Sequence, residues 1–146
     1  MKKILFSICM AILVFASVGC RKDPQHGVSM ATAYYTVQQS QWITGTQLDY
    51  FYASFEDVDI TSDVIEKGCV VVYFVDSDNR DNPMPCEFYK QGTDANGNTV
   101  YYADKFSFDA EPGIVTFKFQ ASDFDNAVSL SGYGDITFKV CVLANN

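Results

Sequence analysis

Cys20 is the residue whose surroundings most clearly specify a chemical reaction. It follows a leader in which Lys2 and Lys3 precede an apolar run over residues 4–18, and Gly19 stands directly before it. A basic start, an apolar stretch of about 7–15 residues and small residues at the cleavage point are typical of a secretory signal. A cysteine directly after that point is typical of a bacterial lipoprotein signal, in which the thiol takes a lipid.

The leader leaves plain secretion open as a second interpretation. Plain secretory signals favour an Ala-x-Ala pattern, whereas Ser17 and Gly19 precede the cysteine here, so we favour lipidation at Cys20. The processed cysteine would carry three acyl chains of the palmitate type, and two or more chains hold a protein firmly on a membrane. Because Arg21 rather than an acidic residue follows, the predicted location is the outer membrane, on either its periplasmic or its cell-surface face.

The anchor divides the chain into three predicted parts. Residues 1–19 are the signal peptide, residues 20–30 are the lipidated cysteine and a tether, and residues 31–146 are one domain. Without Lys2 and Lys3, 8 basic residues face 18 acidic ones, which gives a net charge of −10. A charge of that sign repels nucleic acid, so the predicted partners are the membrane and possible envelope ligands, and not nucleic acid.

Histidine and cysteine offer little catalytic chemistry. The only histidine, His26, lies in the tether, where it cannot be held within hydrogen-bond reach of a nucleophile or in a zinc site. Cys69, Cys86 and Cys141 show no CxxC spacing. Two of them could pair in an oxidising compartment, but we favour at least one of them as a small buried apolar side chain.

Carboxylates are numerous enough to suggest two kinds of site. The run 76–82 has acids at positions one and three of a calcium loop and Glu87 at position twelve, but Arg80 stands at position five and Asp81 replaces the glycine at position six. A polar hairpin loop explains the same run without calcium. A glycosidase needs two carboxylates across a cleft, and some pair always looks suitable among 18 acids. We expect no enzyme activity, no metal and no cofactor.

The elements that would position these residues are short strands. β-Branched and aromatic residues, which favour strands, fill residues 31–37, 48–55 and 69–75. Residues 114–120 and 135–143 alternate apolar and polar side chains, as half-buried strands do. The run 69–75 is apolar on both sides, which is typical of a central strand covered on both faces.

Turn signals separate these strands. Thr61 offers a capping oxygen for one short helix over residues 64–67, and Gly68 would end it. Residues 94–98 contain Asn-Gly, which favours a hairpin turn because both residues tolerate positive φ. Short strands, regular turns and at most one short helix predict an all-β fold, an antiparallel β-sandwich of the jelly-roll-like or Greek-key kind.

One stretch resembles small lipoproteins of Bacteroidota. Their recurring pattern is I-T, then I-L-x-x-G, then V-L-V-Y, and this chain has Ile60-Thr61, residues 64–68 and residues 70–74 in that order. Met84-Pro85 falls where those proteins often have Leu-Pro, and residues 138–143 are similar to their closing strand. Many of them carry a collagen-like Gly-Pro tract after the anchor, which this chain lacks. The resemblance implies a β-sandwich in the cell envelope and brings no catalytic residues.

Aromatic residues make binding a better expectation than catalysis. They form 15% of the chain, and rings on a sandwich surface can stack on sugar faces. Adjacent tyrosines on a strand point to opposite faces, so one of each pair can be exposed while the other packs in the core. The candidates are Trp42, which we would test first, with Tyr34, Tyr35, Tyr101, Tyr102 and Tyr133.

Three functions remain open. The leading hypothesis is an outer-membrane lipoprotein whose sandwich is a non-catalytic binding or structural module. One alternative is glycan capture at the cell surface. The other is a subunit of a surface appendage or envelope assembly, with another envelope protein as partner. Assembly predicts an exposed edge strand or a detachable terminal strand, for which residues 134–143 are the candidate.

Overall fold

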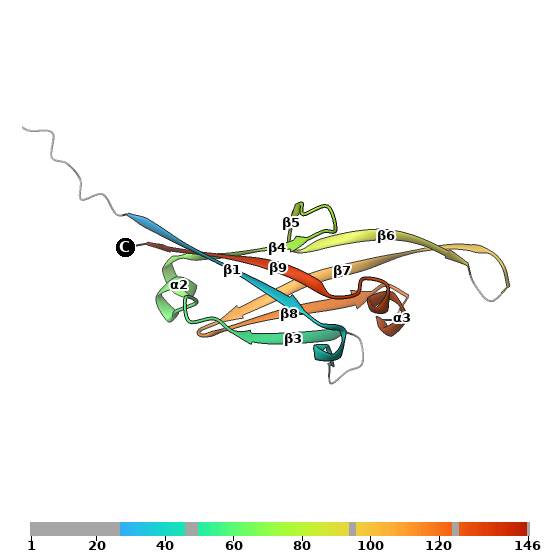
Figure 1. Cartoon of the computed structure of the whole chain (residues 1–146), viewed down its shortest axis with the longest axis horizontal. Helices are drawn as coiled ribbons and strands as arrows, with labels where there is room; N and C mark the ends of the chain where they lie inside the picture. Colours follow the sequence, from blue (N-terminus) through green and yellow to red (C-terminus); the bar gives the residue numbers. More distant parts are fainter. Residues whose placement is uncertain (1–26, 46–49, 94–95, 124–125, 146) are drawn as a thin grey trace, which may run out of the picture.

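The computed structural model describes residues 27–45, 50–93, 96–123 and 126–145. They form two stacked antiparallel sheets (Figure 1), so the predicted all-β sandwich is confirmed. One sheet has the strand order β1 (Val28–Val37), β9 (Ile136–Asn145), β4 (Cys69–Val75) and β5 (Asp81–Pro83). The other has the order β2 (Ile43–Thr44), β3 (Phe51–Glu56), β8 (Ile114–Ala121), β7 (Thr99–Glu111) and β6 (Cys86–Thr93).

The chain passes between the sheets four times, from β1 to β2, from β3 to β4, from β5 to β6 and from β8 to β9. β3 and β4 are consecutive strands in different sheets, and so are β8 and β9, while β3 pairs with β8 and β4 pairs with β9. The closing strand β9 therefore lies between β1 and β4, with hydrogen-bonded neighbours on both sides. The suggestion that residues 134–143 form an exposed or detachable terminal strand is wrong, because leaving the sheet would break both ladders.

The core follows the predicted alternation. Val115, Phe117 and Phe119 of β8 are buried, and so are the alternate residues of β9 that begin at Ile136. Phe117 and Phe138 stack across the two sheets, with ring centroids 4.2 Å apart and planes at 12°. β4 differs from its prediction, because on its outer side Cys69 is exposed, Val71, Tyr73 and Val75 are only half-buried, and no third layer of described residues covers them.

Within the described ranges, two short α-helices and a turn of 3-10 helix connect the strands. The predicted helix is confirmed as α2 (Ser62–Lys67), where the Thr61 hydroxyl accepts a 3.2 Å hydrogen bond from the backbone N–H of Val64. It ends at Gly68, where a Cβ would lie 2.3 Å from the carbonyl oxygen of Leu143. The 3-10 turn is η2 (Gln39–Gln41). The second helix, α3 (Asn126–Ser131), was not predicted, because its six residues are too few to show a helical periodicity.

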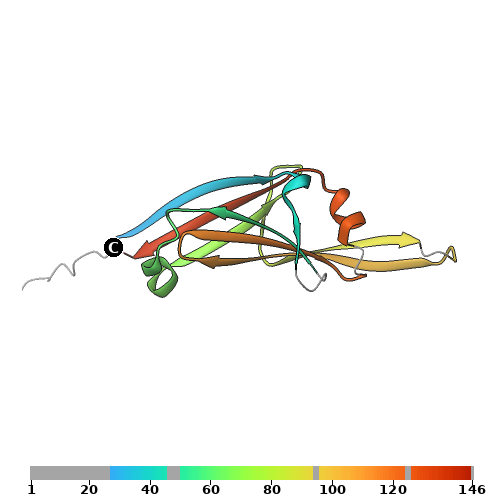
Figure 2. The ribbon, with the colours of Figure 1, turned by 90° about the horizontal axis from the view of Figure 1, so that it is seen from below.

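The molecule has two distinct ends. The β6–β7 hairpin, whose strands meet at Thr93 opposite Thr99, extends past the other strands, and this is the hairpin end (Figures 1 and 2). The start of β1, the end of β9, α2 and the β7–β8 turn lie at the opposite end, which we call the tether end (Figures 1 and 2). β7 has 13 residues and runs between the two, a distance of about 40 Å.

Several sequence predictions fall outside the described residues. Cys20, the signal peptide, His26 and part of the hairpin turn are among them. Across the residues that are described, no helix has the length and apolar character needed to cross a membrane.

Candidate functional site

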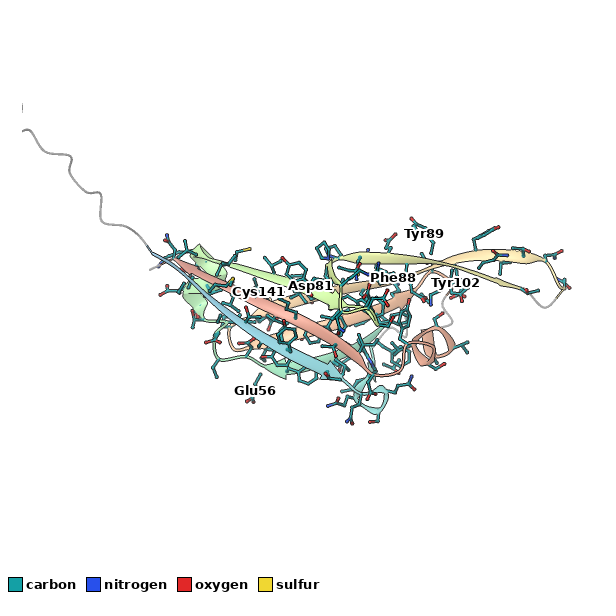
Figure 3. The ribbon with its side chains drawn as sticks, turned by 45° about the horizontal axis from the view of Figure 1, so that its top comes forward. Glu56, Asp81, Phe88, Tyr89, Tyr102 and Cys141 are labelled. Carbon is teal, nitrogen blue, oxygen red and sulfur yellow. The ribbon has the colours of Figure 1, made fainter. Side chains whose placement is uncertain are left out.

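A cavity of about 600 Å³ opens where the β4–β5 loop, the start of β9 and strand β6 meet. Its walls are aromatic and its rim is polar. Figure 3 shows the orientation on β6, where Phe88 points toward the sandwich and the adjacent Tyr89 points away from it. The aromatic lining residues are Tyr34, Phe74, Phe88 and Tyr133, and the rim holds Asp76, Ser77, Asn79, Asp135 and Thr137.

Two of the six predicted binding residues meet at this cavity. Tyr34 reaches it from β1, where 64% of the residue is exposed, and Tyr133 reaches it from the segment after α3. Ninety-nine positions separate them in the chain, and they come together because β1 and the start of β9 are neighbours in one sheet.

Trp42 does not present its ring to solvent. Only 8% of the residue is exposed, and its ring meets Phe138 edge-on with centroids 6.4 Å apart. The preceding glutamines form η2 and face water, while the indole turns inward beside a smaller cavity of about 180 Å³ that Phe51 and Leu130 also line. The expectation that Trp42 is the first surface ring to test is therefore corrected, because the core covers it.

The remaining predicted tyrosines lie away from the cavity. Tyr35 packs against Phe55 and Phe117 in the core. Tyr101 is 76% exposed on the outer face of the hairpin, while Tyr102 is half-buried on the inner face beside Gly92. The expectation that adjacent tyrosines point to opposite faces is confirmed.

Three aromatic residues of this region were not predicted from the sequence. Phe74 and Phe88 line the cavity, and Tyr89 is 82% exposed on the same face of the hairpin as Tyr101. Alternation in residues 86–93 was the available signal. Lys90 interrupts it, because it puts a charge on the inward face.

A buried cluster holds Tyr133 in place. The Tyr133 hydroxyl donates a 2.9 Å hydrogen bond to Oδ2 of Asp104, which is 1% exposed. Lys90 Nζ lies 3.7 Å from the same oxygen and 4.3 Å from the centre of the Tyr133 ring. Burial first, and then the Asp104 carboxylate, raise the pKa of Tyr133. The phenol therefore stays protonated, and its ring forms a fixed wall of the cavity.

The β4–β5 loop fixes the polar rim. Asp76 Oδ1 accepts hydrogen bonds of 2.9 Å from the backbone N–H groups of Asp78 and Arg80. The Arg80 guanidinium binds Oδ2 of Asp76 at 3.1 Å and Oδ2 of Asp78 at 2.5 Å. These donors, chiefly the Arg80 backbone N–H, lower the pKa of Asp76. The run considered for calcium is thus a polar hairpin loop whose carboxylates bind the chain's own donors.

No family model, curated protein or solved structure matches the chain. Among the described residues, no group of three or more His, Cys, Asp or Glu side chains is placed to hold a metal ion.

The three described cysteines are all free thiols. Cys141 is buried, with its sulfur 3.8 Å from the Thr32 hydroxyl, which confirms the expectation of at least one small buried cysteine. Burial raises the pKa of Cys86 to about 11. Cys69 is exposed.

Proposed function

We propose that this chain is a lipid-anchored protein of the outer membrane whose sandwich is a non-catalytic binding module, and that its cavity takes a carbohydrate. The observation that carries the proposal is the combination in one cavity of an exposed tyrosine, a fixed aromatic wall and a rim of hydrogen-bonding groups. The leader before Cys20 supports the lipid anchor.

The cavity offers contacts both to the apolar C–H face of a sugar ring and to its hydroxyl groups. A volume of about 600 Å³ falls within the range of ligand sites, which combine apolar walls with a few placed polar groups. The exposed ring of Tyr34 offers a flat surface for the C–H face of a sugar. Asp135 offers acceptor oxygens for sugar hydroxyls, while the side chains of Ser77 and Asn79 can also donate.

The protonation states do not support Asp76 or Tyr133 as a general acid. A general acid at neutral pH needs a carboxyl group with a raised pKa, and the pKa of Asp76 is lowered by its loop. The Tyr133 phenol already donates to Asp104, so it is occupied as a structural donor. The cavity thus offers fixed acceptors and rings, and we propose no chemical step within it.

A glycan array probed with the mature protein tests the proposal. Tyr34→Ala should weaken binding to any glycan on the array about tenfold, because it removes one stacking surface. Tyr101→Ala is the matched control, since Tyr101 is similarly exposed but lies outside the cavity. Absence of any bound glycan, or equal losses from both variants, would count against a carbohydrate site.

Assembly with another envelope protein is the second candidate, and the hairpin end favours it. β6 is an edge strand of its sheet, and Tyr89 and Tyr101 project from the same outer face of the hairpin. An exposed edge with large side chains can accept a strand from a partner. Cross-linking in intact envelopes should then give one specific product that is lost in the double variant Tyr89→Ala/Tyr101→Ala and kept in Tyr34→Ala.

A further inference from the structure

The residues that line the cavity carry charge of only one sign. Asp76 and Asp135 lie on its rim, and no lysine or arginine is among the described residues that line it. The chain as a whole has the same bias, with a net charge of −8. A charged ligand therefore meets a negative potential at the mouth of the cavity.

The cations near the cavity are already paired with acids. The β4–β5 loop, β9 and β6, which meet there, contribute one cation each. Arg80 binds the two aspartates of its own loop at 3.1 and 2.5 Å. Lys139 Nζ lies 2.6 Å from Oδ2 of Asp81. Lys90 Nζ lies 3.7 Å from Oδ2 of Asp104. An acidic ligand would therefore have to compete with the protein's own carboxylates for each of these cations.

The two rim carboxylates differ in what they can offer a ligand. Both oxygens of Asp76 accept hydrogen bonds from donors of its own loop. Asp135 is exposed, and none of the ion pairs between described residues involves it. The rim thus presents one negative charge, that of Asp135, without a described counter-ion.

The strand register separates this carboxylate from the exposed ring of Tyr34. Tyr34 lies opposite Lys139 in the ladder between β1 and β9, and Asp135 precedes Lys139 by four positions. Four residues of extended chain cover about 13 Å, which is longer than one sugar ring. Because Tyr34 and Asp135 line the same cavity, a carbohydrate that contacts both must contain at least two sugar units.

We infer that the cavity takes an oligosaccharide that carries a protonated amino group and disfavours one that carries a carboxylate. The inference rests on the carbohydrate binding proposed above. An ammonium group beside Asp135 would supply the counter-ion that this carboxylate lacks among the described residues, whereas a sugar carboxylate there would be repelled. The face of the Tyr34 ring also attracts cations. Since water reaches the rim and screens the pair, the amino group should strengthen binding only about threefold.

Three tetrasaccharides with the same linkage test the inference. They are built from glucosamine, from N-acetylglucosamine and from glucuronic acid, so they differ chiefly in charge. Binding to the mature protein is measured by isothermal titration calorimetry at slightly acidic pH, where the amines are protonated and Asp135 stays ionised. The glucosamine tetramer should bind about threefold more tightly than the N-acetylated one, and the glucuronic acid tetramer should bind most weakly.

Two variants separate the role of Asp135 from that of net charge. Asp135→Asn should bring the ratio between the glucosamine and N-acetylglucosamine affinities close to one, because it removes the charge and keeps the size of the side chain. Glu66→Gln is the matched control, since Glu66 is also exposed but lies on α2 at the tether end, and it should keep the ratio of the wild type. Raising the salt concentration should lower the ratio in the wild type and leave it unchanged in D135N.

The outcomes keep this inference apart from the proposed function. Equal affinities for the three tetramers, or the same preference in D135N as in the wild type, overturn the selection by charge and leave the carbohydrate site standing. Loss of the preference in E66Q as well as in D135N assigns it to net charge and overturns the role of Asp135. Binding of none of the three also overturns the inference, and the glycan array then decides whether the cavity takes a carbohydrate at all.

Discussion

Two buried carboxylates, Asp57 and Asp104, lie close to tyrosines and have different environments. Asp104 accepts a direct hydrogen bond from Tyr133 and lies beside Lys90. Asp57 Oδ1 accepts a 3.0 Å bond from the backbone N–H of Asp59, while the Tyr35 hydroxyl donates to the Glu56 carbonyl at 3.4 Å. Neither Asp104 Oδ1 nor Asp57 Oδ2 has a hydrogen-bond partner among the described residues.

The two environments indicate different roles, because Asp57 is a structural carboxylate whereas Asp104 also shapes the cavity. Asp57 fixes a turn within its own segment, next to the β7–β8 turn that its N–H binds. Asp104 joins residues of β6, β7 and the segment after α3, and so orients a wall of the cavity. A buried acid with long-range partners should matter more for stability and for the site than one with local partners.

Removing the long-range carboxylate should have the largest effect. Asp104→Ala leaves the Tyr133 hydroxyl buried without an acceptor, so we expect a loss of about 3 kcal/mol in the free energy of unfolding. Asp104→Asn keeps an acceptor oxygen and should lose only about 1 kcal/mol. Urea unfolding measures both values. Near-ultraviolet circular dichroism should change in D104A as the Tyr133 ring loses its fixed position, and an unchanged spectrum would contradict its role as an anchored wall.

Removing the local carboxylate should cost less. Asp57→Ala loses one hydrogen bond to a backbone N–H in a surface turn, which predicts a loss of about 1–2 kcal/mol by urea unfolding. The near-ultraviolet spectrum should change less than in D104A, because the Tyr35 hydroxyl near Asp57 also donates to the Glu56 carbonyl and its ring packs against Phe55 and Phe117. Equal destabilisation by D57A and D104A would remove the distinction between the two acids.

Lys90 is a cation beside Asp104, whereas no ion pair of the described residues involves Asp57. Lys90→Met keeps the length of the side chain but removes its charge from the Asp104 carboxylate and the Tyr133 ring. The Lys90 side chain is 38% exposed, and solvent screens such pairs, so we expect a loss of about 1 kcal/mol. Raising the salt concentration should narrow the gap between wild type and K90M in urea unfolding. A gap that does not depend on salt would assign the effect to packing.

The sequence predicted local features better than long-range ones. Alternation located β8 and β9, and Thr61 and Gly68 located α2, because each signal lies within one element. The cavity draws on four separate segments, so no local pattern could reveal it. The exposure of Trp42 was predicted wrongly, because a preceding polar run indicates a loop but does not indicate whether the next side chain turns toward the core. Asp104 left a usable signal, since it shares the inward parity of Phe106 on β7.

Alkaline titration compares Tyr35, which lies near Asp57, with Tyr133, which lies near Asp104, and it has the smallest expected effect on stability. Burial, and then Asp57, raise the pKa of Tyr35 from 10.0 to about 12. A pKa raised in the folded state stabilises the fold fully below pH 10, and this contribution is lost as the pH rises through 12. Tyr35→Phe should therefore flatten the fall in stability between pH 10 and 12. The tyrosinate absorption should show Tyr35 ionising within that window while Tyr133, whose pKa is also raised, ionises only as the protein unfolds.

If both phenols titrate together in the folded protein, the Tyr133 hydroxyl is not held by Asp104, and the contrast between the two acids fails.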